Sequence, residues 1–155
     1  MTTTLSSTSR YVDLQLSTHF KLSEMIRSGF AERKGIDNYP KEQAVIENLK
    51  ALCENVLEPI REEFGKPITP TSGYRSKTVN DGVGGAEKSQ HTRGEAVDFV
   101  VPGIPKETVL KYIRQNLTYD QAIDELWNSS SKGWIHVSYK RVGTNRKELF
   151  AIPRR

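Results

Sequence analysis

Residues 79–101 read VNDGVGGAEKSQHTRGEAVDFVV, and in this stretch a glycine-rich loop runs directly into a short apolar strand. Residues 96–101 are apolar apart from Asp98, and Pro102 and Gly103 follow them, which is typical of a buried strand that ends at a turn. The 17 residues before the strand form a long loop, and loops of that length inside a compact domain usually have a function. We therefore expect a core strand with a functional loop at its start.

Helical periodicity is clearest upstream of this stretch. Apolar residues recur at three- and four-residue steps between residues 45 and 60, which predicts a long core helix. Pro59 lies inside that pattern and has no backbone N–H, so we expect a kink or a break there. A short helix is expected to start near Ser23, which is placed as its cap, and another helix is expected after Pro105.

The remaining regular structure is predicted to be β. Residues 67–76 favour a short strand that runs into a turn, and three later stretches, YDQAIDELW, GWIHVSY and KELFAI, read as strands joined by polar or glycine-containing turns. We expect these last three to form an antiparallel meander. The order of elements predicts an α+β fold in which helices pack on one face of a mostly antiparallel sheet.

The length of 155 residues matches one ordinary domain. Residues 1–18 are rich in Ser and Thr, so we expect a flexible N-terminal segment followed by a single domain over residues 19–155. No apolar run approaches the roughly 18 residues that a membrane span needs, and the first 16 residues do not resemble a secretory signal. The lone Cys53 lies on the apolar face of the long helix, which predicts a buried thiol.

Positive charge is concentrated at the C-terminus. The net charge is +4, and residues 132–155 hold seven basic side chains against Glu148 alone, which makes a basic C-terminal tail. Such a segment attracts polyanions, whether nucleic acid, anionic cell-wall polymers or lipid headgroups, and a merely solubilising surface is the simpler alternative. A nucleic-acid-binding function depends on this tail alone, so no nucleic acid is expected as the main partner.

Two of the three histidines have unusual neighbours. His91 lies at the end of the glycine-rich loop, seven residues before Asp98, and His136 lies inside a predicted strand. Because side chains alternate along a strand, His136 shares a face with Trp134 and points away from the apolar side. Two imidazoles and a carboxylate are a common ligand set for catalytic zinc, although each residue also has an ordinary structural interpretation in a loop or sheet.

Three motifs together resemble a known family. They are the stretch SQHTRGEAVD at 89–98, the upstream SGYRS at 72–76 and the later WIHVSY at 134–139. Over about residues 20–139 they are similar to the zinc D-Ala-D-Ala carboxypeptidase family, which includes peptidoglycan peptidases and shares its fold with the hedgehog signalling domain. Within the family, the chain most resembles the compact subgroup common in phage and prophage proteins. The resemblance implies one zinc ion held by His91, Asp98 and His136.

The resemblance leaves the general base less clear. Several family members carry a glutamate three residues before the last histidine, but this chain has Gly133 there. Glu125 matches the hedgehog-type arrangement, in which the acid comes from the preceding strand. In an antiparallel pair Glu125 can lie opposite or diagonal to His136, while Asp124 should point to the other face. We therefore expect Glu125 to be the base.

Further site residues follow from the same resemblance. Arg75 is expected to support catalysis and to bind the substrate carbonyl or carboxylate, and the alternative is a surface arginine that ties a loop. Ser89 is expected to hydrogen-bond the substrate. Trp134 and Tyr139 are expected to wall the groove, although aromatic residues on strands more often pack.

The implied function is a zinc-dependent peptidase that hydrolyses an amide bond in peptidoglycan stem peptides. D-Ala-D-Ala carboxypeptidase and L-Ala-D-Glu endopeptidase activities both remain open, with peptidoglycan or muropeptide as substrate and a monomer as the expected state. Gly133 motivates an alternative, a catalytically inactive zinc-containing module that binds cell wall or another protein. The sequence leaves the localisation open: without a signal peptide, synthesis in the cytoplasm is expected, and both phage-type release to the cell wall and a cytoplasmic dipeptidase fit.

Overall fold

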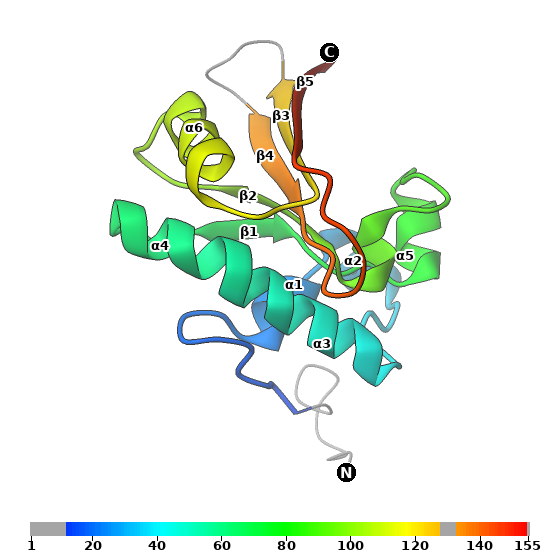
Figure 1. Cartoon of the computed structure of the whole chain (residues 1–155). Helices are drawn as coiled ribbons and strands as arrows, with labels where there is room; N and C mark the ends of the chain where they lie inside the picture. The colour runs from blue at the N-terminus through cyan, green and yellow to red at the C-terminus, as the bar shows by residue number, and fades with distance from the viewer. Residues whose placement is uncertain (1–11, 128–132, 155) are drawn as a thin grey trace.

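The computed structural model describes residues 12–127 and 133–154. Over these residues five strands form a sheet in the order β1-β2-β4-β3-β5, with helices around it (Figure 1). The strands are β1 (Thr69–Ser72), β2 (Ala96–Val100), β3 (Gln121–Trp127), β4 (Gly133–Ser138) and β5 (Glu148–Arg154). The helices are α1 (Leu22–Ile26), α2 (Gly29–Lys34), α3 (Gln43–Leu52), α4 (Glu58–Phe64), α5 (Lys77–Gly82) and α6 (Lys106–Asn116), with a π-helical turn η1 (Cys53–Leu57) and a 3₁₀ turn η2 (Gln90–Arg93). The predicted α+β fold is confirmed.

The strand directions differ from the prediction in one place. β1, β2, β4 and β3 pair antiparallel, but β5 runs parallel to β3. The predicted antiparallel meander is therefore wrong for β5. Because β4 already has β2 and β3 as neighbours, β5 joins the sheet outside β3, and the chain enters it beside the start of β3, where the backbone N–H of Glu148 donates to the carbonyl of Asp120.

The hydrophobic core lies on one face of the sheet. Val97 and Phe99 of β2 and Ile135 and Val137 of β4 are buried there, in one cluster with side chains of the long helix and of α6. Figure 1 shows these helices gathered on that side of the sheet. Since side chains alternate along each strand, the opposite face of β2 and β4 carries their polar residues.

The long helix contains the irregularity that Pro59 predicts. α3, η1 and α4 follow one another without a break, and the backbone N–H of Glu58 donates to the carbonyl of Cys53, five residues earlier. This wider turn lies directly before Pro59, which has no N–H to donate and whose ring crowds the preceding turn. Within the described residues no helix combines the length and apolarity that crossing a membrane requires.

The start of the described chain is packed. Leu16 is buried in the core, and Asp13 accepts hydrogen bonds from the backbone and hydroxyl of Ser23. Ser23 is therefore inside α1, and it does not have the predicted role of its cap. The flexible segment expected over residues 1–18 is, from residue 12 onward, part of the packed structure, and residues 1–11 lie outside the described residues.

The C-terminal residues also belong to the fold. Residues 148–154 form the edge strand β5, and Arg146 just before it donates two side-chain hydrogen bonds, of 3.0 and 2.6 Å, to the buried carboxylate of Asp120. Within the described residues, the segment predicted as a basic tail therefore contains strands β4 and β5, and Arg146 anchors it beside the start of β3.

Candidate metal centre

Two candidate ligands face each other across adjacent strands. Asp98 of β2 is the direct antiparallel partner of His136 of β4, and its Oδ1 atom lies 2.9 Å from Nδ1 of His136. His91 comes from η2, just before β2, and its Nε2 atom lies 3.5 Å from the same carboxylate oxygen. One donor atom from each of the three residues lies within 4.8 Å of the others. The residues that sequence analysis selected as ligands therefore converge.

The ring of His91 is oriented by a hydrogen bond on its far side. Its Nδ1 atom lies 2.7 Å from the carbonyl oxygen of Gly73. A carbonyl only accepts, so Nδ1 is the donor of this bond, and Nε2 is the ring nitrogen that faces Asp98. Histidines that bind metals are usually held in this way by a second hydrogen bond.

Burial and charge also suit a cation. His91 and Asp98 are buried, and His136 is half-buried. Burial opposes ionisation of Asp98, but the hydrogen bonds and charge of His136 and His91 outweigh it and hold the pKa of this carboxyl well below its usual range. Two imidazole nitrogens and a carboxylate are the donor set of many three-ligand zinc sites, so the residues present fit a zinc ion.

Gly94 fixes the turn between His91 and Asp98. Its φ is +75°, and a Cβ at this position would lie 2.7 Å from the carbonyl oxygen of Val45. The close approach is therefore to the backbone of α3, where a side chain would force η2 away from the helix. Sequence analysis predicted a ligand-bearing loop here, and the contact with α3 explains how that loop is held.

A cavity of about 670 Å³ opens over the three ligands and contains the predicted base. Glu125 lines it and is only 5% exposed. In the register of β3 with β4, Glu125 lies opposite Trp134 and Ile123 lies opposite His136, so Glu125 is diagonal to the histidine. Glu125 therefore faces the same cavity as the ligands, as its predicted role requires.

The neighbouring carboxylate lies on the other face. Oδ1 of Asp124 lies 2.7 Å from Nζ of Lys106 at the start of α6, and Asp124 is not among the described residues that line the cavity. The alternation of side chains along β3 thus separates a cavity-facing acid from one that pairs with a helix.

Arg75 is held beside the ligands by a polar network. Its guanidinium donates to Oγ of Ser72 at 3.1 Å and to Oδ1 of Asn80 at 2.9 Å, and its Nη2 atom lies 3.8 Å from Oδ2 of Asp98. The amide of Asn80 in turn donates to the carbonyl of Ala86. Arg75 therefore lines the cavity in a fixed orientation next to the second carboxylate oxygen of Asp98.

The other predicted substrate contacts divide into two groups. Ser89 and Trp134 line the cavity, and the hydroxyl of Ser89 also accepts from the backbone N–H of His91. Tyr139, by contrast, packs against the hydrophobic core and is not among the described residues lining the cavity. Strand alternation explains this, because Tyr139 has the parity of the core residues Ile135 and Val137.

Several residues of the site were not predicted from the sequence. Ile152 of β5 lines the cavity, and so do Arg27 and Arg33 at the other end, beside α2. Nothing in the local sequence around Ile152 could place it there, because its position depends on β5 pairing outside β3. Asn80, only 1% exposed, accepts a hydrogen bond from Arg75, a role that was not predicted from the sequence.

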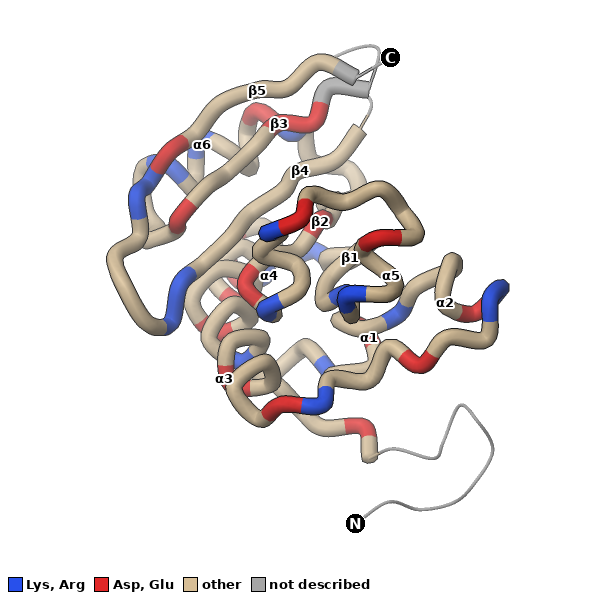
Figure 2. The backbone as a smooth tube through the Cα atoms, turned by 90° about the vertical axis from the view of Figure 1, so that its right-hand side faces the viewer, with Lys and Arg blue, Asp and Glu red and all other residues tan. Residues whose placement is uncertain are grey.

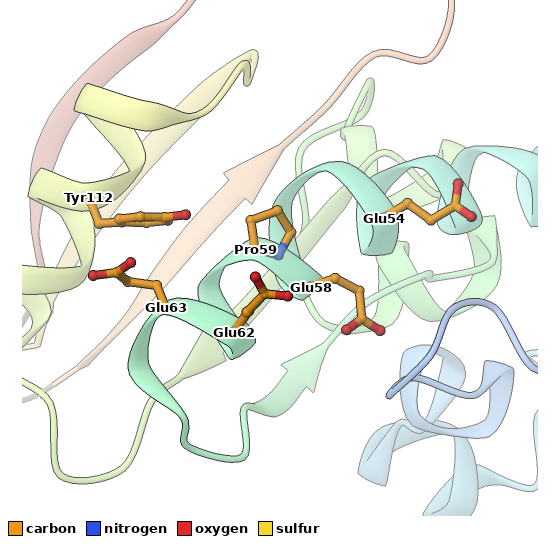
Figure 3. Close-up of a pocket in the computed structure, with 6 residues that line it drawn as sticks. All are labelled: Glu54, Glu58, Pro59, Glu62, Glu63 and Tyr112. Atoms are coloured by element: carbon orange, nitrogen blue, oxygen red, sulfur yellow. The ribbon is translucent and has the colours of Figure 1, made fainter.

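Two other cavities lack the full ligand set. One of about 500 Å³ adjoins the site and shares Asp98 and Trp134 with it. The other, of about 430 Å³, lies along the long helix beside Tyr112, and Figure 3 shows the glutamates that line it. They are Glu54, Glu58, Glu62 and Glu63. None of the predicted site residues lies in this acidic cavity.

Comparison with known proteins agrees with the geometry. Residues 18–138 match the family model described as Peptidase M15, which covers well over half of the chain. A shorter segment of 44 residues, 28% of the chain, is 48% identical to the zinc D-Ala-D-Ala carboxypeptidase of Streptomyces albus G. That segment spans 17% of the length of the Streptomyces protein.

Proposed function

The chain belongs to the peptidase M15 family, and from this premise we propose that it is a zinc-dependent peptidase that hydrolyses an amide bond in peptidoglycan stem peptides. The observation that carries the proposal is the convergence of His91, Asp98 and His136 in a cavity that Glu125 also lines. The carboxypeptidase activity named for the Streptomyces relative supports the class of substrate.

His91, Asp98 and His136 would hold the ion. Zinc bound to such a set supplies an activated water near neutral pH and polarises a carbonyl group. Glu125 accepts the proton of the attacking water and delivers it to the leaving amine, which requires a carboxylate facing the same space as the ligands. Glu125 is only 5% exposed and lies between Trp134 of β4 and Ile152 of β5 in the sheet.

Arg75 and Ser89 bind the substrate in this proposal. The guanidinium of Arg75 is a permanently charged planar donor, and its bonds to Ser72 and Asn80 fix its direction. It is placed to hold a carbonyl or carboxylate oxygen of the peptide near Asp98. Ser89 offers a hydroxyl on the same wall, and Trp134 provides an apolar surface above the ligands.

Two bonds within the stem peptide are candidates, the terminal D-Ala-D-Ala bond and the L-Ala-D-Glu bond. Digestion of purified peptidoglycan and of soluble muropeptides, with products identified by mass spectrometry, distinguishes them. The reaction is run with zinc and with a chelator. We expect a chelator-sensitive product, either loss of terminal D-alanine or a cut at L-Ala-D-Glu. Zinc-loaded protein that binds wall fragments of several cross-link types but releases no product would instead support a non-catalytic binding module.

A further inference from the structure

The cavity over the ligands extends well beyond them. The order of the strands places Glu125 of β3 and Ile152 of β5 on one side of the ligand strands β2 and β4. On the other side lies β1, against which α1 packs, and the chain then enters α2. Gly29, Phe30 and Arg33 of α2 line this second end of the cavity, together with residues 83–86 after α5. The groove therefore continues past Arg75.

The wall at this second end is closely packed. A Cβ at Gly82 would lie 2.2 Å from the ring of Phe30, so α5 and α2 touch without space between them. A Cβ at Gly85 would lie 2.1 Å from Oδ1 of Asn80 and 2.8 Å from Nη1 of Arg75. The small residues thus let the loop after α5 lie directly against the network that holds Arg75. A closely packed wall of this kind can orient a bound group.

The two ends of the groove differ in charge. Among the described residues that line it, the only carboxylates are Asp98 and Glu125, and both lie at the ligand end. At the α2 end the charged residues are Arg27 and Arg33, both exposed. Figure 2 shows basic residues on α2, where Glu32 and Lys34 flank Arg33 but do not line the groove.

Within residues 12–127 and 133–154, Arg27 and Arg33 take part in no ion pair, whereas nearby Lys77 is neutralised by Asp81 at 2.9 Å. Arg33 lies back along α2, with its Nη1 atom 3.2 Å from the position that a Cβ of Gly29 would take. The absence of a side chain at Gly29 therefore gives the guanidinium room on the groove side of the helix.

We propose that Arg27 and Arg33 form an anion subsite of this groove, which binds a carboxylate of the peptide substrate beyond Arg75, on the side away from Glu125. This inference rests on the proposed peptidase function, and it identifies the substrate as an extended acidic peptide that occupies both ends of the groove. Two guanidinium groups on a solvent-exposed wall contribute modestly to affinity, and the contribution depends on salt. A subsite of this kind mainly selects peptides that carry a carboxylate at the matching position.

The test uses two stem peptides of identical sequence, one with the free α-carboxylate of its D-glutamate and one amidated at that position. Their dissociation constants are measured by calorimetry with zinc-loaded Glu125→Gln protein, which holds them without cleavage. We expect the acidic peptide to bind about fivefold more tightly at low ionic strength, and this preference to shrink as salt is added. In the Arg27→Ala, Arg33→Ala double variant the two peptides should bind equally.

Lys34→Ala is the matched control, because Lys34 is an exposed cation of the same helix that does not line the groove. It should keep the preference. Equal binding of the two peptides by the parent protein, no binding of either, or a preference that survives the double substitution would each overturn the subsite. Hydrolysis is measured separately with Glu125 intact. Cleavage without charge preference removes the subsite alone, and charge preference without cleavage removes the peptidase function alone.

Discussion

Nδ1 of His136 lies 2.9 Å from Oδ1 of Asp98, and the two residues are direct partners across β4 and β2. The register of the sheet therefore fixes the relative position of two of the three candidate ligands. The third, His91, lies in η2 and not in a strand. A slip of one residue in this register would turn one of the two side chains toward the core. The hydrophobic residues that alternate with them, Val97 and Ile135 among others, thus keep the ligands together.

Asp98→Asn is predicted to weaken zinc binding strongly. The substitution keeps the shape of the side chain but removes the charge that His91 and His136 stabilise. Because even residues that only support a ligand are worth about 10- to 100-fold in metal affinity, we expect a loss of at least that size. Competition with a chromophoric chelator measures it. His19→Ala serves as control, since His19 pairs with Glu58 instead, and an Asp98→Asn protein with parental affinity would contradict the ligand assignment.

Glu125→Gln is predicted to keep zinc and lose turnover. The amide cannot accept the proton, so kcat should fall by about 10²- to 10⁴-fold, the usual contribution of a general base. Zinc affinity should stay at the parental value because Glu125 is not in the ligand cluster. Stopped digests of muropeptides give kcat, and chelator competition gives the affinity.

Asp124→Asn is the matched control for this prediction. It removes a carboxylate one residue away that pairs with Lys106 on the other face of β3. We expect this variant to lose stability and to keep kcat close to the parental value. The assignment of the base fails if Glu125→Gln is fully active, or if the two variants lose kcat equally.

Local patterns in the sequence predicted most of this site. The alternation in residues 134–138 places His136 on the polar face and Ile135 in the core, and the structure agrees. The same alternation assigns Tyr139 to the core side. The prediction that Tyr139 walls the groove therefore conflicted with the alternation that correctly placed His136. The choice of Glu125 over Gly133 depended on the family resemblance, because spacing alone does not reveal how two strands pair.

The sequence could not predict the part of the site that depends on long-range pairing. Nothing within residues 147–152 specifies a parallel partner. β5 lies outside β3 because both sides of β4 are occupied, and it runs parallel to β3 there. Ile152 enters the cavity only as a result. The sequence also could not place Arg27 and Arg33 in the groove, since α2 reaches the groove through the packing of Phe30 on Gly82.

Protonation of Asp120 is predicted to lower the stability of the protein in acid. This carboxylate is fully buried, and its hydrogen bonds with Arg146 hold its pKa at about 2. In the unfolded chain its pKa is about 3.9, so the folded state is favoured above about pH 4, and this contribution is lost as the pH falls toward 2. Because Arg146 is 45% exposed, we expect a contribution of about 1–2 kcal/mol after screening by solvent.

Urea unfolding of the parent and of Asp120→Asn at pH 7, 4 and 2.5 measures this contribution. Between pH 4 and pH 2.5 the parent should lose more stability than the variant. The free energies of unfolding of the two proteins should therefore converge in acid. Asp81→Asn is the control, since Asp81 is an exposed partner of Lys77 and its removal should leave the acid dependence intact. Parallel curves for the parent and Asp120→Asn would exclude Asp120 as a source of acid sensitivity.

Gly94→Ala is predicted to damage the fold and the metal centre together. The left-handed backbone at Gly94 disfavours any side chain, and the added Cβ would also meet the Val45 carbonyl oxygen at 2.7 Å. We expect a loss of about 2–4 kcal/mol in the free energy of unfolding, together with weaker zinc binding, because η2 carries His91. Gly103→Ala separates backbone strain from the contact with α3. Gly103 has a φ of +84° but nothing within 4 Å of its added Cβ. This variant should therefore lose only the cost of the backbone strain, about 1–2 kcal/mol, and keep its zinc affinity. Equal losses in the two variants, or parental zinc affinity in Gly94→Ala, would mean that the contact with α3 does not hold the metal-binding turn in place.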